Sequence, residues 1–139
     1  MDQLNWLVNH RFQEALRYEF SWAFVFDEGA SATVECLWRL VENGRIRVTS
    51  QDDGHQFGLP AAIDGVLEVN QRLTGAMVDS VALSEGSLDL EIRFDTGHAL
   101  QFIAVSSGYE AWSMNDRSRQ FIAVGGGELA VVGKNSSEA

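Results

Sequence analysis

Two short motifs occur twice in this chain, in the same order in each half. Val-Asn-x-Arg occurs at residues 8–11 and again at 69–72, and Phe-Asp-x-Gly occurs at 26–29 and again at 94–97. Turn-forming residues recur in unrelated hairpins, so the second motif alone would fit convergence. Turn chemistry does not account for Val-Asn-x-Arg. The order of the motifs therefore predicts an internal pseudo-twofold repeat.

The repeat predicts two units of similar structure, over residues 4–58 and 65–132. Each unit is expected to contain a short helix followed by an antiparallel β-meander. The chain has 139 residues, the length of one ordinary domain. We therefore expect a single domain over 1–132, with a polar tail at 133–139. The predicted fold class is α+β, mainly antiparallel β-meanders with two short helices and a possible internal duplication.

Local patterns position these elements along the chain. Apolar residues at helical spacing indicate a helix over about residues 2–11. Pro60 suits the first turn of a second helix, which is expected to stop at Gly75. Apolar and charged residues alternate from Leu88 to Phe94, as in a sheet with one solvated face. The dipeptide Asn43-Gly44 is the strongest hairpin signal in the chain.

The chain is strongly acidic, with 10 Lys+Arg, 20 Asp+Glu and a net charge of −10. Nucleic-acid binding relies on clustered Lys and Arg, which this sequence lacks, so we expect no nucleic-acid partner. The acidity favours either solubility alone or steered encounter with a basic partner. No segment has the pattern of a signal peptide, and no apolar run is long enough to span a bilayer. We therefore expect a cytoplasmic protein without membrane contact.

No specific catalytic, metal or cofactor motif is present in the sequence. The single cysteine, Cys36, lies in an apolar run and is interpreted as a buried, inert thiol in a reducing compartment. The three histidines, His10, His55 and His98, lack the spacing of a metal site. The run at 125–127, Gly-Gly-Gly, lacks the Lys and Ser/Thr of a phosphate loop and is interpreted as a turn or bulge between strands. A binding protein without cofactor is therefore favoured over an enzyme.

Aromatic and charged residues gather in two short segments, one around Trp112 and one around Trp38. Tyr and Trp are the residues that interfaces use as anchors. In a repeat, the two segments would lie near the pseudo-twofold axis or at matched edges, where a groove with carboxylates would bind a basic peptide or a cationic ligand. The alternative for both Trp is a place in the core of their sheets. The predicted binding residues are Glu35, Trp38, Arg39, Tyr109, Glu110 and Trp112.

The pattern Leu-x-Leu-x-Ile-x-Phe-Asp-x-Gly-x-x-Leu at 88–100, followed by Tyr-Glu-x-Trp at 109–112, resembles small bacterial domains of unknown function. Some domains similar to these are thought to act as immunity proteins in toxin systems. The resemblance covers about residues 73–114. It implies an acidic, β-rich cytoplasmic protein without catalysis, and it transfers no functional residues.

We therefore expect a non-enzymatic binding protein that engages a basic protein partner. The alternative is a small-molecule binder, or an unrecognised enzyme, with a pocket between the two halves. Such a pocket would be lined by Trp38, Tyr109 and Trp112, with Glu35 or Glu110 as its polar group. A carboxyl group buried against an indole has a raised pKa and would serve as a general acid.

The last expected strand, residues 128–132, is apolar apart from Glu128. A strand at the edge of a sheet presents unpaired N–H and C=O groups, which proteins blunt, cover or pair. The sequence therefore predicts that this strand is either internal to its sheet or paired across a twofold axis in a homodimer.

Overall fold

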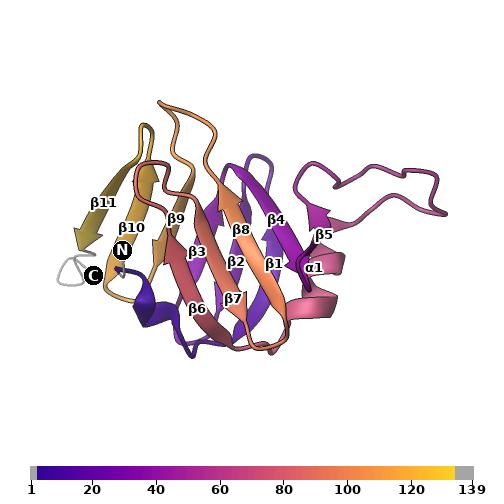
Figure 1. Cartoon of the computed structure of the whole chain (residues 1–139), viewed down its shortest axis with the longest axis horizontal. Coiled ribbons are helices and arrows are strands. Elements are labelled where there is room, and N and C mark those ends of the chain that lie inside the picture. Colours follow the sequence, from indigo (N-terminus) through magenta and orange to yellow (C-terminus); the bar gives the residue numbers. More distant parts are fainter. Residues whose placement is uncertain (1–2, 134–139) are drawn as a thin grey trace.

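The computed structural model describes residues 3–133, and over this range the regular secondary structure is almost entirely β-strand. Eleven strands, one α-helix and one 3₁₀ turn follow each other along the chain (Figure 1). Their bounds are η1 (Asn5–Leu7), β1 (Phe12–Arg17), β2 (Trp22–Phe26), β3 (Ser31–Val34), β4 (Leu37–Glu42), β5 (Arg45–Thr49), α1 (Gly65–Leu73), β6 (Val78–Leu83), β7 (Leu90–Phe94), β8 (His98–Ile103), β9 (Trp112–Asn115), β10 (Arg119–Val124) and β11 (Glu128–Gly133).

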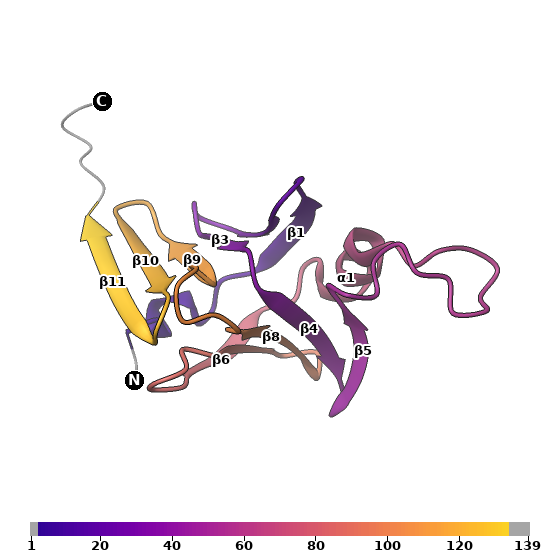
Figure 2. The ribbon, with the colours of Figure 1, turned by 90° about the horizontal axis from the view of Figure 1, so that it is seen from above.

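The strands form two antiparallel sheets that face each other (Figures 1 and 2). The six-stranded sheet has the order β1-β2-β3-β9-β10-β11, and the five-stranded sheet has the order β5-β4-β8-β7-β6. Aromatic side chains from both inner faces fill the space between them. The ring of Phe24 on β2 lies 5.5 Å from Trp38 and 5.5 Å from Phe102, which belong to the other sheet. The core is therefore the layer between the sheets.

The predicted α+β class is wrong, and the fold is essentially all-β. The N-terminal segment forms only the 3₁₀ turn Asn5–Leu7, because the backbone leaves the helical region at Val8, with ψ 138°, and at Asn9, with φ 74°. The second helix begins at Gly65 rather than near Pro60. Its start is fixed by Asp64, whose side chain accepts a hydrogen bond from the Leu67 N–H at 3.1 Å. Only this nine-residue helix remains of the two that were predicted.

The two sheets share one strand order. The order β1-β2-β3-β9-β10 in the larger sheet corresponds to β6-β7-β8-β4-β5 in the smaller one, and β11 is added to the larger. The pairing of β1 with β2 shifts register after Phe12, and that of β6 with β7 shifts after Val78. Arg11 and Met77, each one residue earlier, form an isolated antiparallel bridge with each other. Descent of this arrangement from a duplicated unit, with boundaries at 4–58 and 65–132, stays a prediction.

The local strand signals are confirmed. Leu88, Leu90, Ile92 and Phe94 are all buried, as their alternation with charged residues predicted. The strand itself begins at Leu90, and Leu88 precedes it with a φ of 61°. Asn43 and Gly44 connect β4 to β5 with φ angles of 50° and 82°. Both angles are positive, as a two-residue type I′ hairpin turn requires.

The helix α1 covers the outer edge of β1. The Asn70 side chain accepts a hydrogen bond from the Ala15 N–H at 2.7 Å and donates one to the Ala15 carbonyl at 3.4 Å. One turn later, the Thr74 hydroxyl donates to the Gln13 carbonyl at 3.2 Å. These side chains form the hydrogen bonds that a neighbouring strand would otherwise form with the Ala15 N–H and C=O groups and with the Gln13 carbonyl.

The opposite end of the six-stranded sheet is formed by β11 (Figures 1 and 2). The predicted alternative in which this strand is internal is therefore wrong, because β10 is the only strand of the described range that pairs with β11. The predicted polar tail lies outside the described residues except for Gly133, which ends β11. Neither helix within residues 3–133 has the length and apolar character needed to cross a membrane.

Candidate binding site

The two segments that carry the chain from one sheet to the other lie side by side. Residues 35–36 lead from β3 to β4, and residues 104–111 lead from β8 to β9. The N–H groups of Glu35 and Cys36 both donate to the Ala111 carbonyl, at 2.9 and 3.1 Å. These hydrogen bonds join the first crossing to the end of the second.

A cavity of about 240 Å³ opens beside this junction, and we call it the crossover pocket. It is lined by the two crossings and by the turn between β1 and β2. The lining residues are Phe20, Glu35, Cys36, Val105, Ser106, Tyr109, Glu110 and Ala111. Three large apolar side chains at its rim are unusually exposed, at 83% for Phe20, 73% for Val105 and 82% for Tyr109. Clustered exposure of this kind marks interaction surfaces.

The backbone that carries Tyr109 is held in place. The Ser106 hydroxyl oxygen accepts hydrogen bonds from the Gly108 N–H at 3.1 Å and the Tyr109 N–H at 3.0 Å. Gly108 also packs against Gly125 in the turn between β10 and β11, where an added Cβ would lie 2.5 Å from the Gly108 backbone. The ring is therefore presented from an ordered loop, which lowers the entropy cost of binding to it.

The charge of the crossover pocket is negative and uncompensated. Glu35 and Glu110 are both exposed, and neither carboxylate forms a hydrogen bond or ion pair with another described residue. No Lys or Arg is among the residues that line the pocket. The nearby guanidinium of Arg17 instead lies over the Trp22 ring at 4.4 Å. Two carboxylates thus remain available to a ligand.

Cys36 contributes a thiol to the pocket, but not a reactive one. Desolvation by burial raises its pKa to about 12, and the negative charges of Asp89 and Glu35 act in the same direction. The thiolate is the reactive form of cysteine. At neutral pH Cys36 is therefore protonated and a poor nucleophile.

The structure separates the six predicted binding residues into three groups. Glu35, Tyr109 and Glu110 come together in the crossover pocket. Trp38 and Trp112 lie in the core, 0% and 1% exposed, which is the alternative that the sequence left open for them. Arg39 points away from the core on the five-stranded sheet, where its Nε donates to the Gln101 side-chain oxygen at 2.9 Å. The small-molecule alternative predicted a pocket lined by Trp38 and Trp112, and neither indole lines the crossover pocket.

The chain matches a family model over residues 4–133, and that family is described as a family of unknown function (DUF6188). The chain belongs to this family. The match spans both sheets and every residue of the crossover pocket. Searches of curated proteins and of solved structures gave no match.

Sequence reasoning missed Phe20 and Val105, which line the same pocket. Phe20 lies in the turn between β1 and β2, and its segment reads as a continuous strand because it has no Gly, Pro, Asn or Asp to mark a turn. Val105 begins the part of the second crossing that leaves the sheet. Val105 is followed by Ser-Ser-Gly, and such small residues mark loops. The sequence therefore held a signal that Val105 is an apolar residue at the start of a loop.

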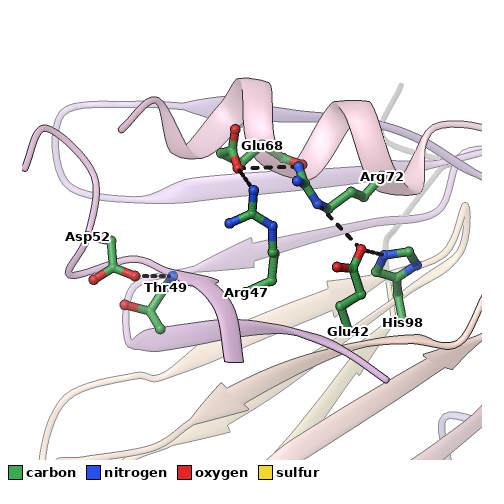
Figure 3. A network of polar contacts seen from close by, with 7 residues as sticks. All are labelled: Glu42, Arg47, Thr49, Asp52, Glu68, Arg72 and His98. Carbon is green, nitrogen blue, oxygen red and sulfur yellow. Dashed lines mark hydrogen bonds and ion pairs between the residues drawn. The ribbon is translucent and has the colours of Figure 1, made fainter. Parts of the chain in front are cut away.

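The other prominent polar cluster is a chain of ion pairs between α1 and the five-stranded sheet (Figure 3). Glu68 on α1 pairs with Arg47 at 3.0 Å and with Arg72 at 3.3 Å. Arg72 pairs with Glu42 at 3.5 Å, and His98 lies 2.8 Å from the same carboxylate. Each cation has an anion partner, so the cluster holds α1 against the sheet.

The histidines occupy three separate places. His98 belongs to the ion-pair chain, His10 lies 3.0 Å from the Asp27 carboxylate, and His55 stacks on Phe57 in the loop between β5 and α1. Within residues 3–133, no three His, Cys, Asp or Glu side chains are grouped as a metal site would need.

Proposed function

We propose that this protein is a non-enzymatic binding protein that engages a basic protein partner through the crossover pocket, in the manner of an immunity protein. One observation carries the proposal. The crossover pocket brings together two carboxylates without an ion-pair partner among the described residues, Glu35 and Glu110, and the exposed rings of Phe20 and Tyr109. A Lys or Arg side chain of the partner is complementary to this surface in both charge and shape.

A partner cation would make two kinds of contact in the pocket. Its aliphatic stem would lie against the apolar side chains of Phe20 and Val105, as long basic side chains do on apolar surfaces. Its charged end would face Tyr109 and the carboxylates. A cation–π contact at an exposed site is worth about 0.5–1 kcal/mol, and an exposed ion pair contributes about 0–1 kcal/mol.

These magnitudes favour a protein partner over a small cation. One basic side chain would gain only a few kcal/mol in the pocket, which corresponds to weak binding. A protein surface adds contacts around such an anchor and excludes water from it, which is how interface hot spots reach high affinity. The net charge of −10 further supports a basic partner, because it accelerates encounter at low salt.

The chemistry of the pocket supports binding rather than catalysis. No histidine lines it, and its thiol is held protonated by burial. The Ser106 oxygen accepts from two backbone N–H groups, and within residues 3–133 it has no hydrogen bond to a side chain that would act as a base. Nucleophilic catalysis requires a nucleophile oriented by a base.

The proposal is tested by affinity capture from the cell of origin at low salt. Wild type is expected to retain a protein of positive net charge that elutes as salt is raised. The double variant Glu35→Gln/Glu110→Gln should lose it, and Tyr109→Ala should weaken retention. The matched control Glu14→Gln/Asp79→Asn removes the same charge from two other exposed carboxylates and should retain the partner.

Two results would contradict the proposal. One is equal retention by wild type and by Glu35→Gln/Glu110→Gln, which would place the contact elsewhere. The other is capture of no protein by wild type at low salt.

A further inference from the structure

Three of the four outer strands of the two sheets are guarded. The edge of β1 is capped by Asn70 and Thr74 of α1. Beside β6, the Val78 carbonyl accepts a hydrogen bond from the Asn9 N–H at 2.9 Å. On β5, Arg45 and Arg47 carry charge along the edge. Covering segments and charged side chains are the usual protection of edges against pairing.

Among residues 3–133, nothing guards the fourth outer strand, β11, in a comparable way. It is six residues long, and Glu128 is its only charged residue. Val131 and Val132 are 52% and 48% exposed. Within residues 3–133, only β10 pairs with it. An apolar edge strand of this length is a template for pairing with another chain.

The exposure of two successive valines identifies the kind of element that fits. Neighbouring residues in a strand point to opposite faces of the sheet. A strand paired edge to edge would satisfy the free backbone groups of β11 and place its own side chains beside both valines, one on each face. A helix packed on one face would leave those backbone groups and one of the valines exposed. The pairing strand must itself be apolar on both faces, and β11 has this composition.

We infer that two copies of this protein pair through β11, antiparallel and across a twofold axis, to join their six-stranded sheets. Such an interface is self-complementary, and it leaves neither β11 with a free edge. This inference is independent of the crossover pocket and of the basic partner proposed for it.

The charge of the chain does not concentrate at this contact. Antiparallel pairing places the two Glu128 side chains at opposite ends of the paired segment. They are at least four residues apart, which is about 13 Å at 3.3 Å per residue. This separation exceeds the Debye length of about 8 Å at physiological salt. Repulsion between two bodies of charge −10 remains, so salt should strengthen the dimer, whereas it should weaken binding of a basic partner.

The first test is the mass in solution, measured by light scattering over a range of salt concentrations. The chain has a mass of 15.4 kDa, and wild type is expected at twice this value at high salt. Val131→Lys should return the mass to that of the monomer. Ile46→Lys is the matched control, since Ile46 is 59% exposed on β5, the edge strand of the other sheet. It should leave the dimer intact.

The second test traps the twofold axis. Antiparallel pairing about a twofold places one residue of β11 opposite itself, at a Cα separation that a disulfide spans. Of the variants Ala130→Cys and Val131→Cys, the one on the axis should form a covalent dimer on mild oxidation. Wild type, which holds only Cys36, should not.

A mass of 15.4 kDa at every salt concentration would overturn the inference. An equal loss of the dimer in Val131→Lys and Ile46→Lys, or a dimer that neither cysteine variant traps, would do the same. The trapping test remains decisive if Val131→Lys fails to fold.

Discussion

Gly127, in the turn between β10 and β11, packs directly against the carbonyl oxygen of Gly86, in the turn between β6 and β7. An added Cβ at residue 127 would overlap that oxygen. Gly125 makes a similar approach to Gly108 in the second crossing. The Gly-Gly-Gly run therefore forms a turn, as predicted, and its lack of side chains lets three connections from the two sheets meet at one end of the fold.

We predict that Gly127→Ala is more destabilising than Gly126→Ala. Both residues have positive φ, 85° and 83°, so both substitutions strain the backbone by about 1 kcal/mol. Only residue 127 also meets the Gly86 carbonyl, whereas the nearest atom to a Cβ at 126 is 3.5 Å away. Displacing that backbone should add about 1–3 kcal/mol. Urea unfolding measures both losses, and equal losses would contradict the close approach.

The hairpins of this fold could be predicted from the sequence because their signals are local. Asn43-Gly44 and the alternation from Leu88 to Phe94 each specify structure within a few residues. The N-terminal helix was predicted wrongly because its local signal was ambiguous. The spacing of Leu4 and Leu7 fits a helix as well as it fits one 3₁₀ turn, and it was the contacts of the folded core that decided between them.

The candidate site was only partly predictable, because pairing between distant strands has no local signal. Glu35 and Tyr109 come together because β3 pairs with β9 and β4 pairs with β8. The predicted repeat suggested that both segments would lie near a common axis or at matched edges. The same reasoning placed Trp38 and Trp112 beside them as binding residues. That reasoning could not show that both indole side chains point into the core, because the register of each strand determines the direction of its side chains.

Asn70→Ala should destabilise the protein by about 1–3 kcal/mol. The substitution removes the amide that pairs with both backbone groups of Ala15 and leaves partly buried polar groups without a partner. Gln71→Ala, at an exposed neighbouring position on α1, is the control and should change stability by less than about 0.5 kcal/mol. Both values follow from urea unfolding at neutral pH. Similar losses in the two variants would mean that the Asn70 contact contributes nothing.

Cys36 should resist alkylation in the folded protein. Its pKa is raised from 9.0 to about 12 by burial, so the thiolate fraction at pH 8 falls roughly a thousandfold. Iodoacetamide should therefore modify native protein far more slowly than protein unfolded in urea, with mass spectrometry as the readout. A native rate within tenfold of the unfolded rate would contradict this burial.

The raised pKa of Cys36 also predicts how the stability of the protein changes at high pH. The folded pKa of Cys36 lies above the unfolded value, so the unfolded state loses this proton first as pH rises. The stabilising contribution is complete below pH 9 and is lost as pH rises toward 12. Cys36→Ala should therefore lose less stability than wild type between these two values, as measured by urea unfolding.

Glu42 should contribute to acid denaturation through the ion-pair chain of Figure 3. A carboxylate can only accept hydrogen bonds, so Nε2–H of His98 donates to Glu42 at 2.8 Å. This hydrogen bond, followed by the charges of His98 and Arg72, lowers the Glu42 pKa below its ordinary value of 4.5. Because the unfolded state then binds a proton more readily, the contribution is present above pH 4.5 and is lost as pH falls through the lowered pKa.

The variant Glu42→Gln isolates this contribution, since glutamine does not titrate. At pH 7 it should be less stable than wild type, and the difference should shrink as urea midpoints are measured from pH 5 down to pH 3. Glu85→Gln is the control, because Glu85 is exposed and has no hydrogen bond or ion pair with a described residue. Its midpoints should follow those of wild type at every pH. A constant difference between Glu42→Gln and wild type across this range would show that the carboxylate charge of Glu42 has no role in acid stability.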